Sequence, residues 1–145
     1  MRAPLAYFDT SVLAKRYLHE STSARAVRWL ERYRPASSAV VSVEVVSALS
    51  RRRSAGDLSE AQFNNLLTLF RRDREHWELF EVSPEVLERA ESIVGQVPVR
   101  TLDALHLASA VLLGESLDRR LAFVTADTRQ REVGGALGLE VVWVG

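Results

Sequence analysis

Short apolar runs alternate with longer amphipathic segments along the chain. The runs at 5–8, 38–41 and 122–125 are four residues long, and each is followed within two residues by a serine or an aspartate. Apolar runs of this length, bounded in this way, are typical of buried strands. Residues 77–82 alternate as a half-exposed strand does, and residues 140–144 predict a last strand. The pattern therefore predicts five short strands.

Between the predicted strands, apolar residues recur every three or four positions, which is the spacing of one helix face. A helix is predicted to begin near residue 11, and others cover residues 21–34, 42–56, 59–70, 84–95, 102–113 and 127–136. Residues that can cap these helices are Ser42, Ser59, Ser83, Thr101 and Asp127. Strands that alternate with helices predict an α/β fold with a mostly parallel sheet covered on both faces. No repeat or linker interrupts the pattern, so we expect one domain over residues 1–145.

The composition is that of an ordinary globular domain, with 47% hydrophobic and 26% charged residues among 145. The absence of cysteine excludes disulfides, thiolate zinc sites and thiol nucleophiles, and it favours a reducing cytoplasm. No apolar run approaches the roughly 20 residues that span a bilayer, and the first nine residues lack the pattern of a signal peptide. We therefore expect a cytoplasmic protein with no membrane partner.

Positive and negative side chains cancel, at 19 each, so no net field draws the whole molecule towards a polyanion. Any such partner must be held locally. Nearly all the basic residues are arginines, which argues against lysine chemistry. The cluster Arg51, Arg52 and Arg53 is explained equally well by contacts with phosphate or a partner and by cations at a solvated helix end.

Acidic residues follow the predicted strands at the edge where parallel sheets bind ligands. Asp9 and Asp127 follow two of the strands, Glu44 lies in the helix after another, and Asp103 opens a helix that can reach the same edge. One such acid alone is explained by the helix dipole. Two carboxylates about 4 Å apart repel by roughly 4 kcal/mol, so several together need a hard divalent cation. The pattern therefore implies Mg²⁺ or Mn²⁺.

Four segments around these acids resemble the acidic motifs of PIN-domain ribonucleases, and the first and third are similar to those of VapC-type toxins. The segments are residues 9–13, 42–49, 100–108 and 125–127, in the order and spacing of that family. The resemblance implies a PIN-like three-layer α/β/α fold and a Mg²⁺- or Mn²⁺-dependent endoribonuclease, the toxin of a type II toxin–antitoxin system. It also implies an RNA substrate, a homodimer and a VapB-type antitoxin. The residues expected to bind the metal and act in catalysis are Asp9, Glu44, Asp103 and Asp127.

The same resemblance gives roles to residues beside the acids. Ser11 and Thr125 are expected to orient carboxylates or metal-bound water. Many PIN domains carry a further acid where this chain has Arg129, which puts a second firmly bound metal in doubt and makes this residue, with Arg100, a candidate phosphate contact. His106 lies one helical turn after an aspartate, and we expect it to be a hydrogen-bonded structural residue rather than a metal ligand.

Water activated by the metal is expected to attack the phosphodiester. The resemblance to PIN-domain ribonucleases implies that this attack leaves 5′-phosphate and 3′-hydroxyl ends. A phosphoaspartyl enzyme is disfavoured because Ser11 stands where its second aspartate is needed, and a receiver domain because Lys15 lies in a predicted helix rather than at a strand end. The remaining alternative is a non-catalytic PIN-like module that binds RNA or protein. Four intact acids argue against it.

Overall fold

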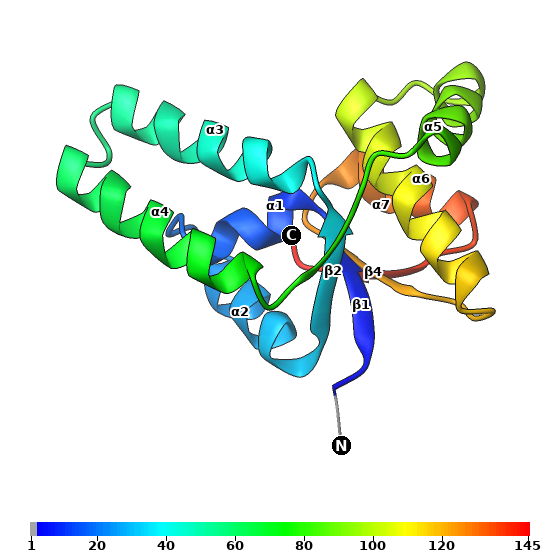
Figure 1. Cartoon of the computed structure of the whole chain (residues 1–145), viewed down its shortest axis with the longest axis horizontal. Helices are drawn as coiled ribbons and strands as arrows, with labels where there is room; N and C mark the ends of the chain where they lie inside the picture. The colour runs from blue at the N-terminus through cyan, green and yellow to red at the C-terminus, as the bar shows by residue number, and fades with distance from the viewer. Residues whose placement is uncertain (1–2) are drawn as a thin grey trace.

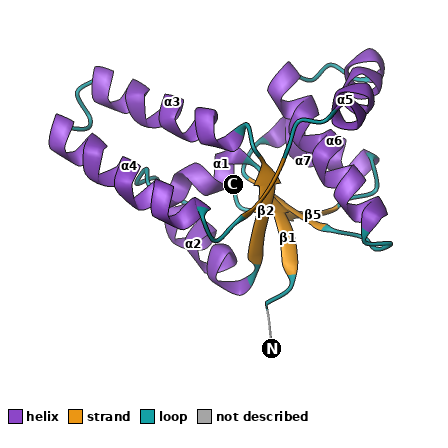
Figure 2. Cartoon of the chain, in the orientation of Figure 1, coloured by secondary structure: helices purple, strands orange, loops and turns teal. Residues whose placement is uncertain are grey.

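Five parallel strands form a central sheet in the computed structural model, which describes residues 3–145 (Figures 1 and 2). The strands are β1 (Leu5–Phe8), β2 (Arg34–Ser38), β3 (Glu78–Phe80), β4 (Ala122–Thr125) and β5 (Glu140–Trp143). Their order in the sheet is β3-β2-β1-β4-β5. The chain moves outward from β1 to β3 and then returns to place β4 on the other side of β1. The strand order therefore reverses between β1 and β4, where sheets of this kind bind ligands.

Helices cover both faces of the sheet (Figure 2). One layer contains α1 (Thr10–Leu13), the 3₁₀ helix η1 (Ala14–Arg16), α2 (Ser23–Arg32), α3 (Val41–Ser54) and α4 (Glu60–Arg74). The other contains α5 (Pro84–Gln96), α6 (Thr101–Ser116) and α7 (Thr128–Ala136). The expected three-layer α/β/α architecture with a parallel sheet is confirmed.

Successive side chains of the central strands enter opposite layers. Ala6 and Phe8 pack with α1 to α4, whereas Tyr7 between them packs with α5 to α7. Val124 and Phe123 of β4 divide in the same way. Both faces of these strands are buried, which explains why they are continuous apolar runs in the sequence.

Helix α6 lies in the core and is apolar on most sides, with nine buried residues. Along residues 3–145, no single helix is long and apolar enough to cross a membrane; α5 and α6 pass that test only as a pair, bent by 120° at their junction.

Three of the predicted helix caps are confirmed, and two are wrong. The Ser59 side chain accepts a hydrogen bond from the backbone N–H of Gln62, and the Ser59 backbone N–H donates one to the Gln62 side chain, while Ser83 and Asp127 each cap the helix that follows. Ser42 and Thr101 do not act as caps, because α3 already begins at Val41 and α6 already includes Thr101. Both helix starts lack a side-chain cap.

The second strand lies earlier than its apolar pattern predicts. We expected residues 38–41, but β2 ends at Ser38 and the next two residues form a turn into α3. The strand starts with Arg34 and Pro35, which pair with the first residues of β1. The sequence of this strand is polar and contains a proline, so it lacks the apolar pattern that predicts a strand. Its position is set instead by pairing with β1. The strand predicted at 77–82 is shorter, at Glu78–Phe80.

Candidate active site

The four expected acids lie at the carboxyl edge of the sheet, each placed by the end of a strand or the start of a helix. Asp9 directly follows β1, and Asp127 follows β4 by one residue, on the two sides of the strand-order reversal. Glu44 lies in the first turn of α3, which continues from β2. Asp103 lies in the first turn of α6. The topology therefore brings together residues from four distant parts of the chain.

Asp9 is buried at the centre of this edge, with only 2% of its surface exposed. Its two oxygens accept hydrogen bonds from the hydroxyls of Ser11 and Thr125, each at 2.5 Å. These hydroxyls themselves accept the backbone N–H groups of Ala126 (2.9 Å) and Asp127 (3.0 Å), so their own protons are directed at Asp9. Ser11 and Thr125, expected to orient carboxylates or metal-bound water, thus both donate to Asp9.

Burial raises the pKa of Asp9 to about 6, even though the two hydroxyls and the nearby His106 lower it. The charge of Asp127 raises it further. A buried carboxylate that has only neutral donors is costly in its ionised form. A cation beside Asp9 would remove that cost.

Asp103 and Asp127 lie on either side of the Arg100 guanidinium, which contacts both carboxylates. The Arg100 guanidinium donates from Nε to Asp103 Oδ2 at 3.4 Å, and its NH2 lies 3.8 Å from Asp127 Oδ2. Burial and the Asp127 charge nevertheless raise the pKa of Asp103 above its ordinary value. The Arg100 side chain is 83% exposed, so this positive charge is weakly held. Arg100, which we expect to contact phosphate, thus lies beside Asp103 and Asp127.

Gln130 is a site residue that the sequence did not reveal. Its backbone N–H donates to Asp127 Oδ1 at 2.9 Å, as the capping signature predicts. Its side chain does not complete a capping box, because the backbone N–H of Asp127 donates to Thr125 Oγ1 instead. The Gln130 side chain turns to α6, where Nε2 donates to Asp103 Oδ1 at 3.4 Å. The residue is buried, at 1% exposure, and it connects α7 to α6. The Asp127-to-Gln130 spacing is the only sequence signal for it.

Glu44 has a different environment, dominated by donors to one oxygen. Thr10 Oγ1 donates to Oε1 at 2.7 Å, and Nε2 of His106 lies 2.7 Å from the same atom. Burial alone would raise the pKa of Glu44, but the hydrogen bonds with His106 and Thr10 hold it below its ordinary value. Thr10 was not singled out in the sequence, although it stands between two residues that were. The expectation that His106 is hydrogen-bonded agrees with its contacts.

The four acids share one edge, but apart from Glu44 Oε2 their oxygens lie next to protein donors. In the part of the chain that the structure describes, no three His, Asp or Glu side chains are arranged so that they can hold a metal ion as they stand. The donor set is nonetheless carboxylate oxygen, which Mg²⁺ and Mn²⁺ prefer. The raised pKa values of Asp9 and Asp103 also fit a cation. Its binding requires at least one carboxylate to rotate away from its present donor.

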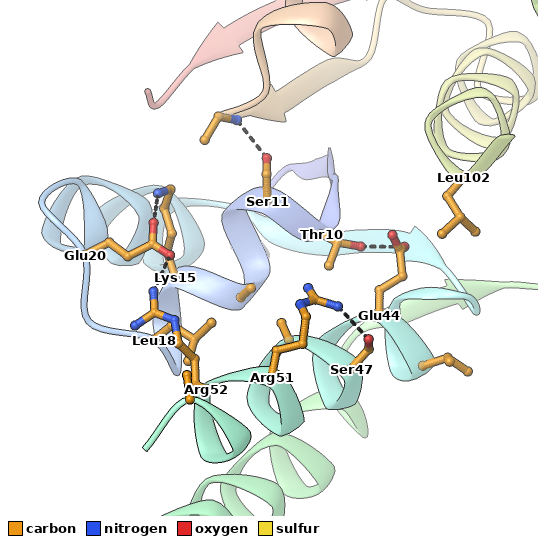
Figure 3. A pocket seen from close by; sticks show the side chains of 15 residues that line it. Thr10, Ser11, Lys15, Leu18, Glu20, Glu44, Ser47, Arg51, Arg52 and Leu102 are labelled. Atoms are coloured by element: carbon orange, nitrogen blue, oxygen red, sulfur yellow. Dashed lines mark hydrogen bonds and ion pairs between the residues drawn. The ribbon is translucent and has the colours of Figure 1, made fainter. Parts of the chain in front are cut away.

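A groove of about 800 Å³ leads away from Glu44 between α1 and α3 (Figure 3). Thr10 and Glu44 line the end of the groove at the candidate site, and Arg51 lines it further along α3. Lys15 and Arg52 are both paired with Glu20 inside the groove, at 2.6 and 3.4 Å.

Two other arginines of the sequence analysis lie outside this arrangement. Arg129 forms an ion pair with Glu132 on α7 at 3.5 Å and is exposed, so the structure gives no contact between it and the four acids. Arg53 forms an ion pair with Glu60 and covers the ring of Phe63. Of the predicted phosphate contacts, only Arg100 is brought to the acids.

Comparison with known proteins gives a consistent match. The family model of the PIN domain matches residues 6–136. Ribonuclease VapC46 of Mycobacterium tuberculosis is 33% identical over 141 residues, covering 94% of this chain and 95% of that protein. A toxin-antitoxin complex from Klebsiella pneumoniae contains a chain with a TM-score of 0.66 and 17% identity, covering 97% of this chain and 98% of that one. VapBC2 from Rickettsia felis, bound to a DNA fragment from its promoter, gives a TM-score of 0.67 at 13% identity, covering 97% and 99%.

Proposed function

Because the chain belongs to the PIN domain family, and within it to the VapC-type proteins, we propose that it is a metal-dependent endoribonuclease and the toxin of a toxin–antitoxin pair. One observation carries the proposal. Asp9 and Asp127 follow the neighbouring strands β1 and β4 on the two sides of the strand-order reversal, and Glu44 and Asp103 open helices at the same edge. An arrangement of four acids at the ligand-binding edge of a parallel sheet suits cation-assisted hydrolysis.

Asp9, Glu44, Asp103 and Asp127 would hold Mg²⁺ or Mn²⁺. When bound, the ion would supply Lewis-acid activation of water and of the scissile phosphate. The chain's own contribution is to position these acids. Asp9 is fixed at both oxygens by hydroxyl protons, and Glu44 is fixed at one oxygen.

The groove beside Glu44 is the proposed path of the RNA strand. Arg51 lies in it, and within the described part of the chain its guanidinium has a hydrogen bond to Ser47 Oγ, at 2.7 Å, but no carboxylate partner. Its positive charge is therefore available to a backbone phosphate. Arg100, exposed beside Asp103 and Asp127, is the second proposed phosphate contact. Water attack along this path is proposed to leave 5′-phosphate and 3′-hydroxyl ends.

We also propose a VapB-type antitoxin as partner, a homodimer and a cytoplasmic location. Two exposed apolar side chains next to the groove support a protein partner. Val43 is 74% exposed and Leu102 is 46% exposed, and both line the groove that contains Glu44. A partner that covers them would also close access to the acids.

The test is RNA cleavage by the purified chain with Mn²⁺ or with EDTA. We expect cleavage only with the metal, 5′-phosphate ends, and loss of cleavage in Asp103→Asn. The matched control is Asp118→Asn, at the far end of α6, where the backbone φ of 51° suits asparagine. Cleavage by Asp103→Asn at the wild-type rate would refute the proposal. Metal-independent binding of RNA without cleavage would instead establish the non-catalytic module.

A further inference from the structure

His106 occupies the centre of a chain of buried hydrogen bonds that ends at Glu44. It lies on α6, one turn after Asp103, and is 2% exposed. Its Nε2 is 2.7 Å from Glu44 Oε1 and 3.1 Å from Thr10 Oγ1, while its Nδ1 is 2.8 Å from the hydroxyl of Tyr7. The chain therefore connects β1, α1, α3 and α6 through four side chains.

The partners of His106 determine which ring nitrogen carries a proton. The ionised Glu44 carboxylate offers only acceptor oxygens, so Nε2 must donate to it. In a neutral ring Nδ1 then has a free lone pair, which accepts the proton of the Tyr7 hydroxyl. That hydroxyl is fully buried and keeps its proton, because burial raises the pKa of Tyr7 well above its ordinary range. One tautomer satisfies all three groups.

Packing prevents the two rings from turning. The Tyr7 ring is stacked on Phe123, with centroids 5.6 Å apart and planes at 17°. It meets His106 edge to face, with centroids 5.8 Å apart at 75°. Such aromatic contacts in a filled core fix ring orientation. The donor at Nε2 is therefore held at one place relative to α3.

The result for Glu44 is an asymmetry between its two oxygens. Oε1 accepts two hydrogen bonds, from Thr10 and His106. Among residues 3–145 no donor is found at Oε2, and Glu44 lines the groove. A carboxylate fixed through one oxygen can present the other to a ligand without a further loss of side-chain freedom.

We propose that His106, supported by Tyr7, is a positioning residue that holds Oε1 of Glu44 so that Oε2 is directed towards the cation. This inference rests on the proposed function, since it assigns the free oxygen to the metal. His106 is not itself a ligand, because the nitrogen on the side of the acids is already donating to Glu44. Helix α6 thereby contributes one acid, Asp103, and the residue that orients another.

The first test is the protonation of His106, measured by long-range ¹⁵N–¹H NMR on the full chain. The chain has three histidines, and His106→Gln identifies the signals of this one. We expect a proton on Nε2 without metal, and the same proton after Mg²⁺ is added. A proton missing from Nε2 in the metal-free chain overturns the proposed contact with Glu44. Loss of the Nε2 proton on addition of Mg²⁺ shows that His106 is a ligand, which also overturns it.

The second test separates positioning from stability. His106→Leu removes the donor, and His106→Gln replaces it with an amide N–H at similar reach. We expect His106→Leu to weaken Mn²⁺ binding, measured by the EPR signal of free Mn²⁺, by about 10-fold or more. The kcat for RNA should fall similarly with KM little changed, and His106→Gln should recover most of both. Tyr7→Phe should give a smaller loss in the same direction.

Leu113→Ala is the matched control, because Leu113 is buried two turns later on α6 and its apolar side chain takes no part in the hydrogen bonds that end at Glu44. It should leave Mn²⁺ affinity and kcat unchanged. If His106→Leu lowers only the melting temperature, with wild-type Mn²⁺ affinity and kcat in the folded protein, the positioning role is refuted. RNA cleavage by the wild-type chain distinguishes failure of the proposed function from failure of the positioning role. Absence of cleavage refutes the proposed function, while NMR and Mn²⁺ binding still decide the role of His106.

Discussion

Neutralising Asp9 should stabilise the metal-free protein at neutral pH and do so less as the pH falls. Burial raises the pKa of Asp9 to about 6, compared with 3.8 for an exposed aspartate. Between these values the folded state binds a proton that the unfolded state has released. The free energy of unfolding must therefore fall as pH rises through this interval, and the loss is complete above pH 6. Asp9→Asn has no such proton to lose.

The magnitude follows from the two pKa values. The full difference corresponds to about 3 kcal/mol, of which about 2 kcal/mol develops between pH 4.5 and pH 7. For a chain of this length that change is worth about 4 to 8 °C in melting temperature. Asparagine loses part of the hydrogen bonding of Ser11 and Thr125, which adds a cost that does not depend on pH. The informative quantity is therefore how the difference in free energy of unfolding between wild type and Asp9→Asn changes with pH, rather than its value at one pH.

The assay is urea unfolding of wild type and Asp9→Asn in EDTA at several pH values. Other groups whose pKa is shifted, such as Glu44 and Asp73, titrate in both proteins and cancel in the difference. Parallel stability curves from pH 4.5 to 7 would show that Asp9 is not held with a raised pKa. Mg²⁺ at 100 times its Kd should then stabilise wild type by about 2.7 kcal/mol and Asp9→Asn by much less.

Three further changes have defined outcomes. Arg51→Ala should weaken RNA binding and reduce the slope of log K for RNA binding against log salt concentration by about one. Arg53→Ala should leave this slope unchanged, because the Arg53 guanidinium is paired with Glu60. Equal slopes for wild type and Arg51→Ala would exclude a phosphate contact. Arg100→Ala should bind Mn²⁺ about twofold to fivefold more tightly, because it removes a cation that competes for two aspartates, while RNA affinity falls; weaker Mn²⁺ binding would contradict this. Leu49→Ala, at 0% exposure in the core beneath α3, should cost about 2 to 5 kcal/mol in urea unfolding, and a loss below 1 kcal/mol would mean that α3 is not packed as described.

The strand and helix pattern predicted the fold because most elements here carry their own signal. Buried parallel strands are apolar on both faces, as 5–8 and 122–125 show, and the Ser59 and Ser83 caps are local hydrogen bonds between residues three apart. The exception is β2, whose Arg34 and Pro35 give no strand signal. Its pairing with β1 overrides local preference.

The sequence by itself determined that acids stand at strand ends and helix starts, since a residue's place within a strand or helix is a local property. Only the tertiary structure decided what each acid contacts. Thr10 and Glu44 are 34 positions apart, Thr125 and Asp9 are 116 apart, and Tyr7 and His106 are 99 apart. No periodicity in the sequence links residues at such separations. The contacts arise because the strand order reverses at β1, which places β4 beside it, and because α6 packs in the same core cluster as Tyr7 of β1. These two features also give Asp9 and Glu44 their distinct environments.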